Sequence, residues 1–357
     1  MHKIALAVAR GANAGKNNVR DPSGETIPRT YVFDEAFSVS WDESILNTKP
    51  SRLPGWWRLA REVQHRHAEY DGIVSWGEKL SLALLIEQQF ARVHKPHVAL
   101  MYQFEKANIR VPLALLKQNL HAVITWSTVQ RRALIERIGY PAERVYLIRH
   151  YVDQLFYSPR PAEQDTICSV GAEMRDFGTL LDALRGTGIP CHVAADHMRV
   201  PGPFRLLNDR RVDVSALRSR ADETVSIGRL PLTELRTLYA RSKFVVVPLL
   251  HSDTDNGVTV ILEAMAMGKP VICSRTRGQV DVIEEGVTGL YVPVGDAQAL
   301  RAAIVSLWND PVRAQQMGRN ARALVEKHHT LEKFTATAKS AAEASLNGIP
   351  APDTHWE

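Results

Sequence analysis

Short apolar runs alternate with helical patterns along most of the chain, and this alternation constrains the fold more than any other feature. Each run has the length and the composition of a buried strand. About ten such runs occur, at 4–9, 72–75, 98–101, 122–125, 145–148, 166–170, 191–194, 224–227, 244–248 and 271–274. Helical patterns lie between many of them, for example at 80–93, 129–138 and 232–240. The alternation indicates an α/β fold in which parallel sheets are covered by helices on both faces.

The chain is long enough for two such sheets, because it has 357 residues and more strands than one sheet of this kind usually carries. The stretch YSPRPAEQD at 157–165 is rich in proline and charge and separates two strand-rich halves. We therefore expect two doubly wound domains, residues 1–158 and 159–330, with a substrate in the cleft between them. The remaining residues, 331–357, are expected to form a helix that crosses back to the first domain, followed by a tail.

Composition and charge exclude several classes of protein. Apolar residues make up 45% of the chain and charged residues 23%, as in ordinary soluble proteins. The net charge of +5 is too small for a dedicated nucleic-acid binder, so we expect no nucleic-acid partner. An anionic ligand and an anionic membrane surface suit this charge equally well, and the alternative is that the small excess has no functional meaning. Without a signal peptide or a membrane-spanning run, the chain is expected to be cytoplasmic.

The three cysteines do not suggest a metal site or a disulfide framework. Cys168, Cys191 and Cys273 each lie in a strand-like apolar run, and none is paired at the spacing of metal ligands. We expect them to be small buried residues in a reducing compartment.

The stretch SDTDNGVTVILEAMAMGKP at 252–270 predicts a helix between two strands. Four apolar residues share one helical face: Val258, Ile261, Leu262 and Met265. Gly268 and Pro270 then end the helix. The flanking runs at 244–248 and 271–274 complete a βαβ unit.

The start of this helix is suited to phosphate. The backbone N–H groups of Gly257, Val258 and Thr259 would lack acceptors at the positive end of the helix dipole. Gly257 would also allow close approach of a ligand to the backbone. Glu263 lies on the flank of the apolar face, where its carboxylate could accept hydrogen bonds from two sugar hydroxyls. A solvated glutamate is the alternative interpretation.

The same stretch contains Asp253-Thr254-Asp255, a D-x-D spacing that can hold a metal beside a nucleotide sugar. Such a motif normally follows a strand directly, whereas here residues 249–252 intervene and a phosphate-ready helix start follows. We therefore predict no metal site and no cofactor.

From Asp255 onward the stretch resembles the signature of GT-B glycosyltransferases of the large retaining family 4, the glycosyl transferases group 1. The usual form in that family is E-G-F-G-x-x-x-x-E-A-M-A-x-G-x-P-V-I. This sequence matches from Glu263 to Ile272, but it has Asp255 for the first Glu and Asn256-Gly257-Val258 for G-F-G. The resemblance implies two facing Rossmann-like domains and a nucleoside-diphosphate sugar as donor.

The resemblance also implies roles for individual residues. Glu263 would hold the donor ribose and Asp255 would meet hydroxyls of the donor sugar. The backbone N–H groups between them, from Asn256 to Thr259, would hold the diphosphate and sugar. The departure at Asp255, shorter than Glu by one methylene, bears on which hydroxyls it meets.

Two further stretches are similar to the same family. SVGAEMRDFGTLLDA at 169–183 resembles the first strand, loop and helix of the donor domain, where Gly171 lies in the loop and Arg175 would neutralise the diphosphate. Without the resemblance, a surface arginine is the better interpretation of Arg175. Gly228 and Arg229 resemble the segment along which the base lies, and 276–293 matches the tail of the domain.

In the first half of the chain the resemblance is confined to the layout. GANAGKN at 11–17 looks like a Walker P-loop, but it has three residues between its glycines instead of four and lacks the Ser or Thr that binds Mg²⁺. We instead expect a cleft-lining loop that touches acceptor or phosphate. Its candidate residues are Gly11, Asn13, Gly15 and Lys16.

The family often has a histidine after the fourth strand, where this chain has Tyr102 and Gln103. Gln103 can hydrogen-bond a sugar hydroxyl but cannot act as an acid or base. His150 begins HYVD where the family usually has N-G-V-D, and we expect it to be a packed residue between the domains and not a catalyst.

The segment SRLPGWWRLARE at 51–62 mixes Leu53, Trp56, Trp57 and Ala60 at helical spacing with three arginines. It suits an amphipathic helix on an anionic membrane near a lipid-linked acceptor. The alternative is that the tryptophans pack onto their own domain.

We therefore predict a metal-independent retaining glycosyltransferase of hexosyltransferase type, in the cytoplasm or on the inner face of the membrane. It would move a sugar to a glycan, lipid-linked or small-molecule acceptor, with Asp255, Glu263 and Arg175 at its centre. Arg175 and the helix N–H groups would stabilise the leaving diphosphate. The alternatives are a non-catalytic nucleotide-sugar-binding protein and a GT-B epimerase or phosphorylase.

Overall fold

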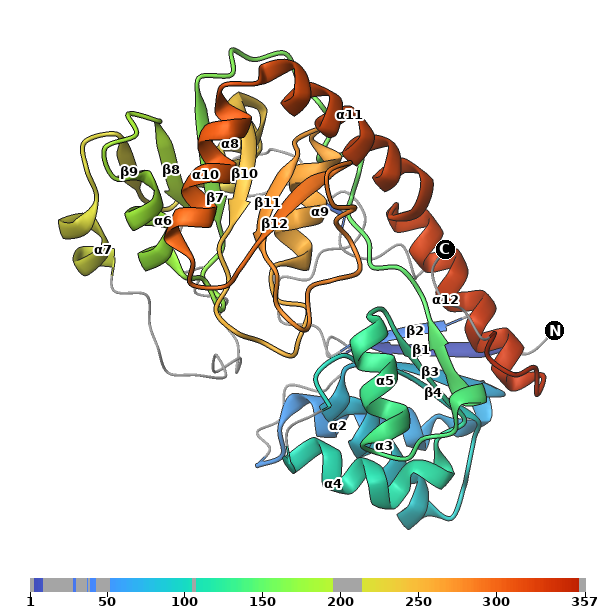
Figure 1. Cartoon of the computed structure of the whole chain (residues 1–357). Helices are drawn as coiled ribbons and strands as arrows, with labels where there is room; N and C mark the ends of the chain where they lie inside the picture. Colours follow the sequence, from blue (N-terminus) through green and yellow to red (C-terminus); the bar gives the residue numbers. More distant parts are fainter. Residues whose placement is uncertain are drawn as a thin grey trace. The chain divides into compact units, whose positions relative to one another are not determined.

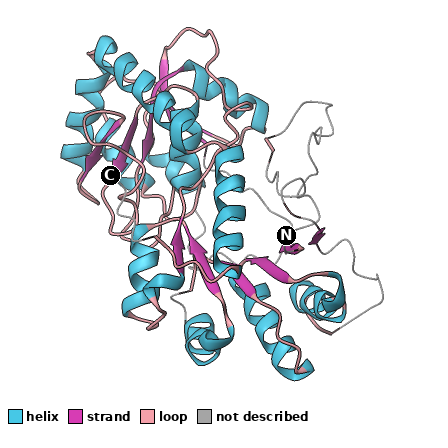
Figure 2. Cartoon of the chain, turned by 90° about the vertical axis from the view of Figure 1, so that its right-hand side faces the viewer, coloured by secondary structure: helices cyan, strands magenta, loops and turns pink. Residues whose placement is uncertain are grey.

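The computed structural model describes residues 3–8, 28–29, 37, 39–42, 52–104, 107–194 and 214–352. These residues form two compact units. The first contains the described residues up to His150, except 28–29, together with those from Glu332 onward. The second contains Tyr151–Leu331 and residues 28–29. Each unit has a parallel sheet with helices packed against it (Figure 1), and Figure 2 shows the same elements coloured by type.

The sheet of the first unit has the strand order β2-β1-β3-β4-β5-β6, and every neighbouring pair is parallel. Its strands are β1 (Ile4–Val8), β2 (Val39–Asp42), β3 (Gly72–Trp76), β4 (His97–Leu100), β5 (Ala122–Thr125) and β6 (Val145–Leu147). The helices are α2 (Gly55–His65), α3 (Glu78–Ala91), α4 (Ala107–Leu116), α5 (Thr128–Glu136) and α12 (Leu331–Leu346), and the short 3-10 turns are η2 (His67–Glu69), η3 (Lys117–Asn119) and η4 (Ala142–Arg144).

Residues from distant parts of the chain complete this first unit. A Cβ added to Gly72 at the start of β3 would lie 2.8 Å from a methyl carbon of Leu346 in α12. The glycine therefore lets the helix approach the strand closely. The hydroxyl of Tyr146 in β6 also donates to the carbonyl of Ile349, just beyond α12.

The sheet of the second unit has the order β12-β11-β10-β7-β8-β9, again with parallel neighbours. Its strands are β7 (Thr166–Val170), β8 (Cys191–Ala194), β9 (Val225–Ile227), β10 (Ser242–Val247), β11 (Val271–Ser274) and β12 (Gly289–Val292). The chain builds outward in one direction from β7 and then returns to begin the other half at β10. The reversal point in such a sheet is where doubly wound domains bind ligands.

Both faces of this second sheet are covered by helices, because successive side chains of β10 enter two different cores. Val245 and Val247 pack in one core with α8, α9 and α11, whereas Phe244 and Val246 pack in the other with α6 and α10. The helices are α6 (Phe177–Leu184), α7 (Val214–Arg220), α8 (Leu232–Arg241), α9 (Val258–Ala266), α10 (Ala297–Trp308) and α11 (Pro311–His328).

The predicted α/β class with two parallel sheets is confirmed. Each expected strand is present with ends that differ by a residue or two, but β2 and β12 were not predicted. Both are edge strands of four residues, VSWD and GLYV, and runs this short carry little pattern. The three cysteines are buried and free, as expected.

The division between the units falls between His150 and Tyr151, before the boundary expected at residues 158 and 159. Val152, Phe156 and Tyr157 are buried in the core of the second unit, so this unit begins ahead of the proline-rich stretch. The described residues from Glu332 onward group with the first unit. None of the helices in the described part of the chain has the length and apolar run needed to cross a bilayer.

Candidate functional site

The candidate site lies where the loops after β7 and β10 meet, at the reversal of strand order in the second sheet. The two loops are joined by backbone hydrogen bonds. The Asp176 N–H donates to the Pro248 carbonyl at 3.0 Å, and the Leu250 N–H donates to the Met174 carbonyl at 2.9 Å. Arg175 lies between these two bonds and forms an antiparallel bridge with Leu249. The loops therefore fix the position of Arg175 beside the end of β10.

Arg175 is a buried cation with 8% of its surface exposed. Its Nε donates to the Val170 carbonyl at 2.9 Å and its Nη1 to the Glu173 carbonyl at 2.8 Å. A Cβ added to Gly171, whose φ is +87°, would lie 2.8 Å from Nη2. Burial lowers the Arg175 pKa, but guanidinium groups remain charged in proteins. Arg175 is therefore an oriented positive charge, not the surface arginine of the alternative interpretation.

The start of α9 faces the same guanidinium. Gly257 is the N-cap at φ +88°, and a Cβ there would lie 3.5 Å from Arg175 Nη1 and 3.0 Å from Val247 Cγ1. No side chain caps this helix among the described residues. One expectation needs correction: the Val258 N–H donates to the Asp255 carbonyl at 3.2 Å. Of the Gly257, Val258 and Thr259 N–H groups, those of Gly257 and Thr259 therefore remain for an anion in the part of the chain that the structure describes.

A second loop, after β11, supports the segment that precedes α9. A Cβ on Gly278 would lie 2.1 Å from the Thr254 carbonyl oxygen, so only glycine fits this contact. Gln279 is 1% exposed, and its Nε2 donates to the carbonyls of Asn256 at 3.2 Å and Asp255 at 3.4 Å. These contacts hold in place the backbone of residues 252–256 before α9, which we call the acidic loop.

The polar side chains of this loop have different surroundings. Asn256 Oδ1 accepts hydrogen bonds from Ser252 and Thr254, so this oxygen faces its own loop. Asp253 is exposed and lies 3.7 Å from Arg277 Nη1. Asp255 is only partly exposed. In the described ranges, the His, Cys, Asp and Glu side chains form no group of three suited to a metal ion.

Glu263, in the second turn of α9, is not a solvated glutamate. Its Oε2 accepts a hydrogen bond of 2.8 Å from the hydroxyl of Tyr239 in α8. Tyr157 also hydrogen-bonds this carboxylate. Burial raises the pKa of Glu263 to about 7, while the two tyrosine hydrogen bonds and the charge of Arg175 act in the opposite direction. Glu263 keeps part of its surface exposed, so its carboxylate sits in a polar cluster beside the apolar core and is open to a ligand.

The other predicted donor residues lie at the same edge of the sheet but farther along. Gly228 and Arg229 follow β9, which is separated from β7 by β8. The Gly228 N–H donates to the Val193 carbonyl at 3.1 Å, and the Arg229 side chain is exposed. The structure thus brings Gly171, Arg175 and the start of α9 together, with Gly228 and Arg229 two strands away.

In the first unit, Tyr102 and Gln103 follow β4 at the carboxyl edge of the sheet. Both of their N–H groups donate to Glu78 Oε1, at 2.7 and 2.6 Å. The Tyr102 ring lies 4.8 Å from that of Trp126, which in turn lies 5.1 Å from the His150 ring. His150 therefore packs among aromatic rings of the first unit. The other predicted cleft residues, Gly11, Asn13, Gly15 and Lys16, lie outside the described residues.

The tryptophan segment forms the start of α2. Trp56 and Trp57 are half-buried and pack against the core of the first unit. Trp57 Nε1 also donates to Glu87 Oε1 at 2.6 Å. The fully buried face consists of Leu59, Ala60 and Val63. Leu59 was not among the residues that the sequence placed on the apolar face of this helix, but it belongs to the buried face.

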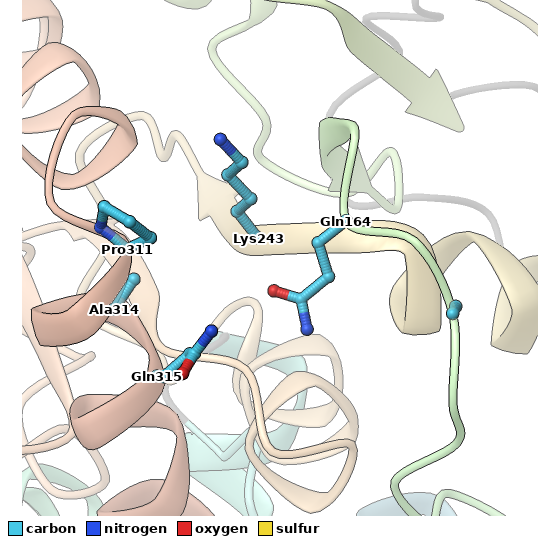
Figure 3. Close-up of a pocket in the computed structure, with 6 residues that line it drawn as sticks. Gln164, Lys243, Pro311, Ala314 and Gln315 are labelled. Carbon is cyan, nitrogen blue, oxygen red and sulfur yellow. The ribbon is translucent and has the colours of Figure 1, made fainter.

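A separate cavity of about 310 Å³ in the second unit lies near the start of β10. Figure 3 shows Lys243, Gln164 and Gln315 around it, with Pro311 and Ala314 from α11. Lys243 stands at the amino end of β10, whereas the candidate site lies beyond its carboxyl end. The cavity is therefore not part of the candidate site, and we assign no role to it.

The fold, with two parallel sheets covered by helices, is the GT-B fold found in solved glycosyltransferases such as that of Rickettsia africae, with a TM-score of 0.65 and 16% sequence identity over 86% of this chain and 85% of that one. HepE from Anabaena, solved in complex with UDP and glucose, has a similar fold with a TM-score of 0.69 and 17% sequence identity, and the match covers 96% of this chain and 100% of that one.

Residues 213–324 match the model of the family described as glycosyl transferases group 1. D-rhamnosyltransferase WbpZ of Pseudomonas aeruginosa is 28% identical over 190 residues, which cover 53% of this chain and 46% of WbpZ. Amylovoran biosynthesis glycosyltransferase AmsK of Erwinia amylovora is 35% identical over 103 residues, which cover 28% of this chain and 25% of AmsK. The chain thus spans less than half the length of these curated relatives.

Proposed function

We propose that the chain is a retaining glycosyltransferase of hexosyltransferase type that uses a nucleoside-diphosphate sugar without a bound metal. The observation that carries the proposal is the convergence of Arg175, the start of α9 and Glu263 at the strand reversal. The similarity to HepE, solved with UDP and glucose, supports a nucleotide-sugar donor. The named activities of WbpZ and AmsK support glycosyl transfer.

In the proposed reaction, the main task of the site is to stabilise the leaving diphosphate. The bond between the anomeric carbon and the phosphate oxygen breaks, and the diphosphate takes the electron pair. Arg175 supplies a positive charge in a buried setting, where it interacts more strongly than in water. The N–H groups of Gly257 and Thr259 add the helix-terminal field. Together these groups do the work that a divalent cation does in metal-dependent enzymes.

Glu263 and Asp255 are proposed to position the donor. Glu263 accepts hydrogen bonds from the two ribose hydroxyls, and Asp255 accepts from hydroxyls of the donor sugar. The acceptor hydroxyl attacks the anomeric carbon on the face that the diphosphate leaves, and its proton passes to the departing phosphate oxygen. This sequence retains the anomeric configuration without a side-chain base.

The acceptor is proposed to be a glycan, a lipid-linked sugar or a small molecule bound by the first unit. Tyr102 and Gln103 stand at the carboxyl edge of that sheet, where doubly wound domains bind ligands. The packing of Trp56 and Trp57 supports a core role for these rings. We therefore do not extend the proposal to contact with a membrane.

The test is release of free nucleoside diphosphate from a panel of nucleotide sugars, with and without EDTA. We expect turnover of at least one donor, unchanged by EDTA and lost in Asp255→Ala and Glu263→Ala. Asp253→Ala is the matched control, because this carboxylate lies in the same loop but pairs with the exposed Arg277. Its turnover should equal that of the wild type.

Three outcomes would contradict the proposal. Loss of turnover with EDTA, restored by Mn²⁺ or Mg²⁺, would indicate a metal site. Donor binding without turnover would favour a non-catalytic nucleotide-sugar-binding protein. Failure to bind any donor in the panel would contradict the whole assignment.

A further inference from the structure

Two buried tyrosines meet the carboxylate that the proposed function assigns to the donor ribose. We propose that Tyr239 and Tyr157 are positioning residues that hold Glu263 oriented and charged for the ribose hydroxyls. The inference rests on the proposed function, because it concerns how the donor-binding carboxylate is prepared for its ligand. Neither tyrosine was among the residues predicted from the sequence to form the site.

The tyrosines approach Glu263 from two different elements. Tyr239 comes from α8, has no exposed surface, and donates its hydroxyl hydrogen to Oε2 at 2.8 Å. Tyr157 lies in the segment before β7, is 3% exposed, and hydrogen-bonds the same carboxylate. The two rings are 6.1 Å apart at an interplanar angle of 73°, an edge-to-face contact. This packing fixes the directions of both hydroxyls, and a carboxylate has enough lone pairs to accept from a ligand as well.

The position of Tyr157 is tied to the helix that carries Glu263. Arg322 of α11 donates through Nη1 to the carbonyls of Tyr157 at 3.0 Å, Gln154 at 3.1 Å and Ala266 at 2.7 Å. Ala266 ends α9, one turn after Glu263. A single guanidinium therefore links the backbone of Tyr157 to α9. This link reduces the motion of the hydroxyl relative to the carboxylate.

The hydrogen bonds from the tyrosines influence whether Glu263 is charged near neutral pH. The charged and titratable groups that face Glu263 are Tyr239 from α8, Tyr157 from the segment before β7, and Arg175 from the loop after β7. Burial raises the Glu263 pKa to about 7, and all three groups act against this rise. Both tyrosines remain protonated donors, because burial raises their pKa values well above the usual range.

Removing one tyrosine hydroxyl therefore favours the neutral carboxyl group. A ribose that presents two hydroxyl donors binds best to a charged acceptor. Donor affinity should thus increase as the pH rises through the pKa of Glu263. When a tyrosine hydroxyl is missing, the same donor affinity should be reached only at a higher pH.

The experiment measures the Kd of a nucleotide sugar from pH 6 to 9 by calorimetry in the wild type, Tyr239→Phe and Tyr157→Phe. A nucleotide sugar is the right probe, because its diphosphate has no proton to lose in this range. We expect tightening with a midpoint near pH 7 in the wild type. In each variant the midpoint should rise by about one pH unit, and binding at pH 7 should weaken about fivefold, because the charged fraction of Glu263 falls from about one half to about one tenth.

Tyr140→Phe is the matched control for loss of a buried tyrosine hydroxyl. Tyr140 is 2% exposed and donates to the Leu120 carbonyl at 2.7 Å, in the first unit. This variant should lose thermal stability, as the other two do, while its Kd and its pH midpoint stay at wild-type values. A merely structural role for Tyr239 would produce the same pattern as this control.

A double-mutant cycle tests whether the tyrosines act through Glu263. Glu263→Gln should weaken binding and remove its pH dependence, and adding Tyr239→Phe should then cause no further loss. An unchanged pH midpoint in both tyrosine variants would overturn the inference, as would an equal loss in the Glu263→Gln background. Either of these two results would leave the proposed function intact, because the wild type would still bind the nucleotide sugar. If the wild type binds no nucleotide sugar, both the function and this inference fall.

Discussion

At the scale of single residues, the candidate site depends on backbone positions that only glycine suits. At Gly171 a positive φ coincides with close contact to the Arg175 guanidinium. Gly257 combines a positive φ with contact to Val247. A side chain at either position would compete with the charged groups for the space that the diphosphate is proposed to occupy.

Gly171→Ala should weaken donor binding by displacing Arg175. The new Cβ would lie 2.8 Å from Nη2, and the backbone at φ +87° would be strained by about 1–2 kcal/mol. Gly186→Ala is the matched control, because its φ is +68° and a Cβ there meets nothing within 4 Å. Both variants should lose thermal stability, but only Gly171→Ala should raise the Kd of the nucleotide sugar. Equal Kd values in the two variants would contradict this account.

At the scale of elements, the loop after β11 supports the loop before α9. Gln279 is buried and donates to two carbonyls of that loop through one amide nitrogen. Gln279→Met keeps the approximate volume and removes the donor. We expect a loss of about 1–3 kcal/mol of unfolding free energy from the unpaired carbonyls, together with weaker donor binding. Denaturant unfolding and calorimetry measure the two effects.

Gln316→Met is the control for the same substitution on a helix surface. Gln316 is exposed on α11, where its hydrogen bonds are to neighbouring surface residues of the helix. Its unfolding free energy should change little and its donor affinity not at all. Wild-type affinity in Gln279→Met would show that the acidic loop keeps its position without this support.

The sequence predicted the elements of the site better than the contacts within it. Helical spacing and the family signature were enough to select Gly257 and Glu263, because both lie in one short stretch. Tyr239 falls on the apolar face of its helix and looks like an ordinary core residue. Its partner Glu263 belongs to another helix, so periodicity reveals the buried face but not the atom that the hydroxyl meets. The N–H of Val258 was assigned to a ligand because the turn back to Asp255 leaves no sequence pattern.

At the scale of the whole molecule, the alternation of strands and helices predicted two parallel sheets, and both are present. The strand order was not predictable in the same way, because it depends on pairings between strands that are distant in sequence. That order places the loops after β7 and β10 together. The division at His150 was also missed, since burial of Phe156 and Tyr157 is a tertiary property.

Acid stability of the molecule should depend on His97 in β4. His97 is fully buried, and its Nε2 lies 2.6 Å from Ser75 Oγ. Burial lowers its pKa from 6.5 to about 3, with a further contribution from His121. The folded state therefore keeps His97 neutral, while the unfolded chain binds a proton below pH 6.5. Stability should fall by about 1.4 kcal/mol per pH unit as the pH drops below that value.

Urea unfolding of the wild type and His97→Phe between pH 7.5 and 5 measures this contribution. The variant should be less stable at pH 7.5, because Ser75 loses a partner, but its stability should fall less steeply with pH. His251→Gln removes an exposed histidine and should retain the wild-type slope. Equal slopes in the wild type and His97→Phe would assign the acid sensitivity to other groups.

The placement of α12 has a consequence for synthesis of the chain. The first unit needs residues from Glu332 onward, including Leu346 against Gly72, whereas most of the second unit is the continuous stretch Tyr151–Leu331. During synthesis on the ribosome, the strands of the first sheet emerge first, but the last helix of that unit emerges only after the second unit has been made. The domain that is translated later is thus the first to have nearly all of its residues available for folding.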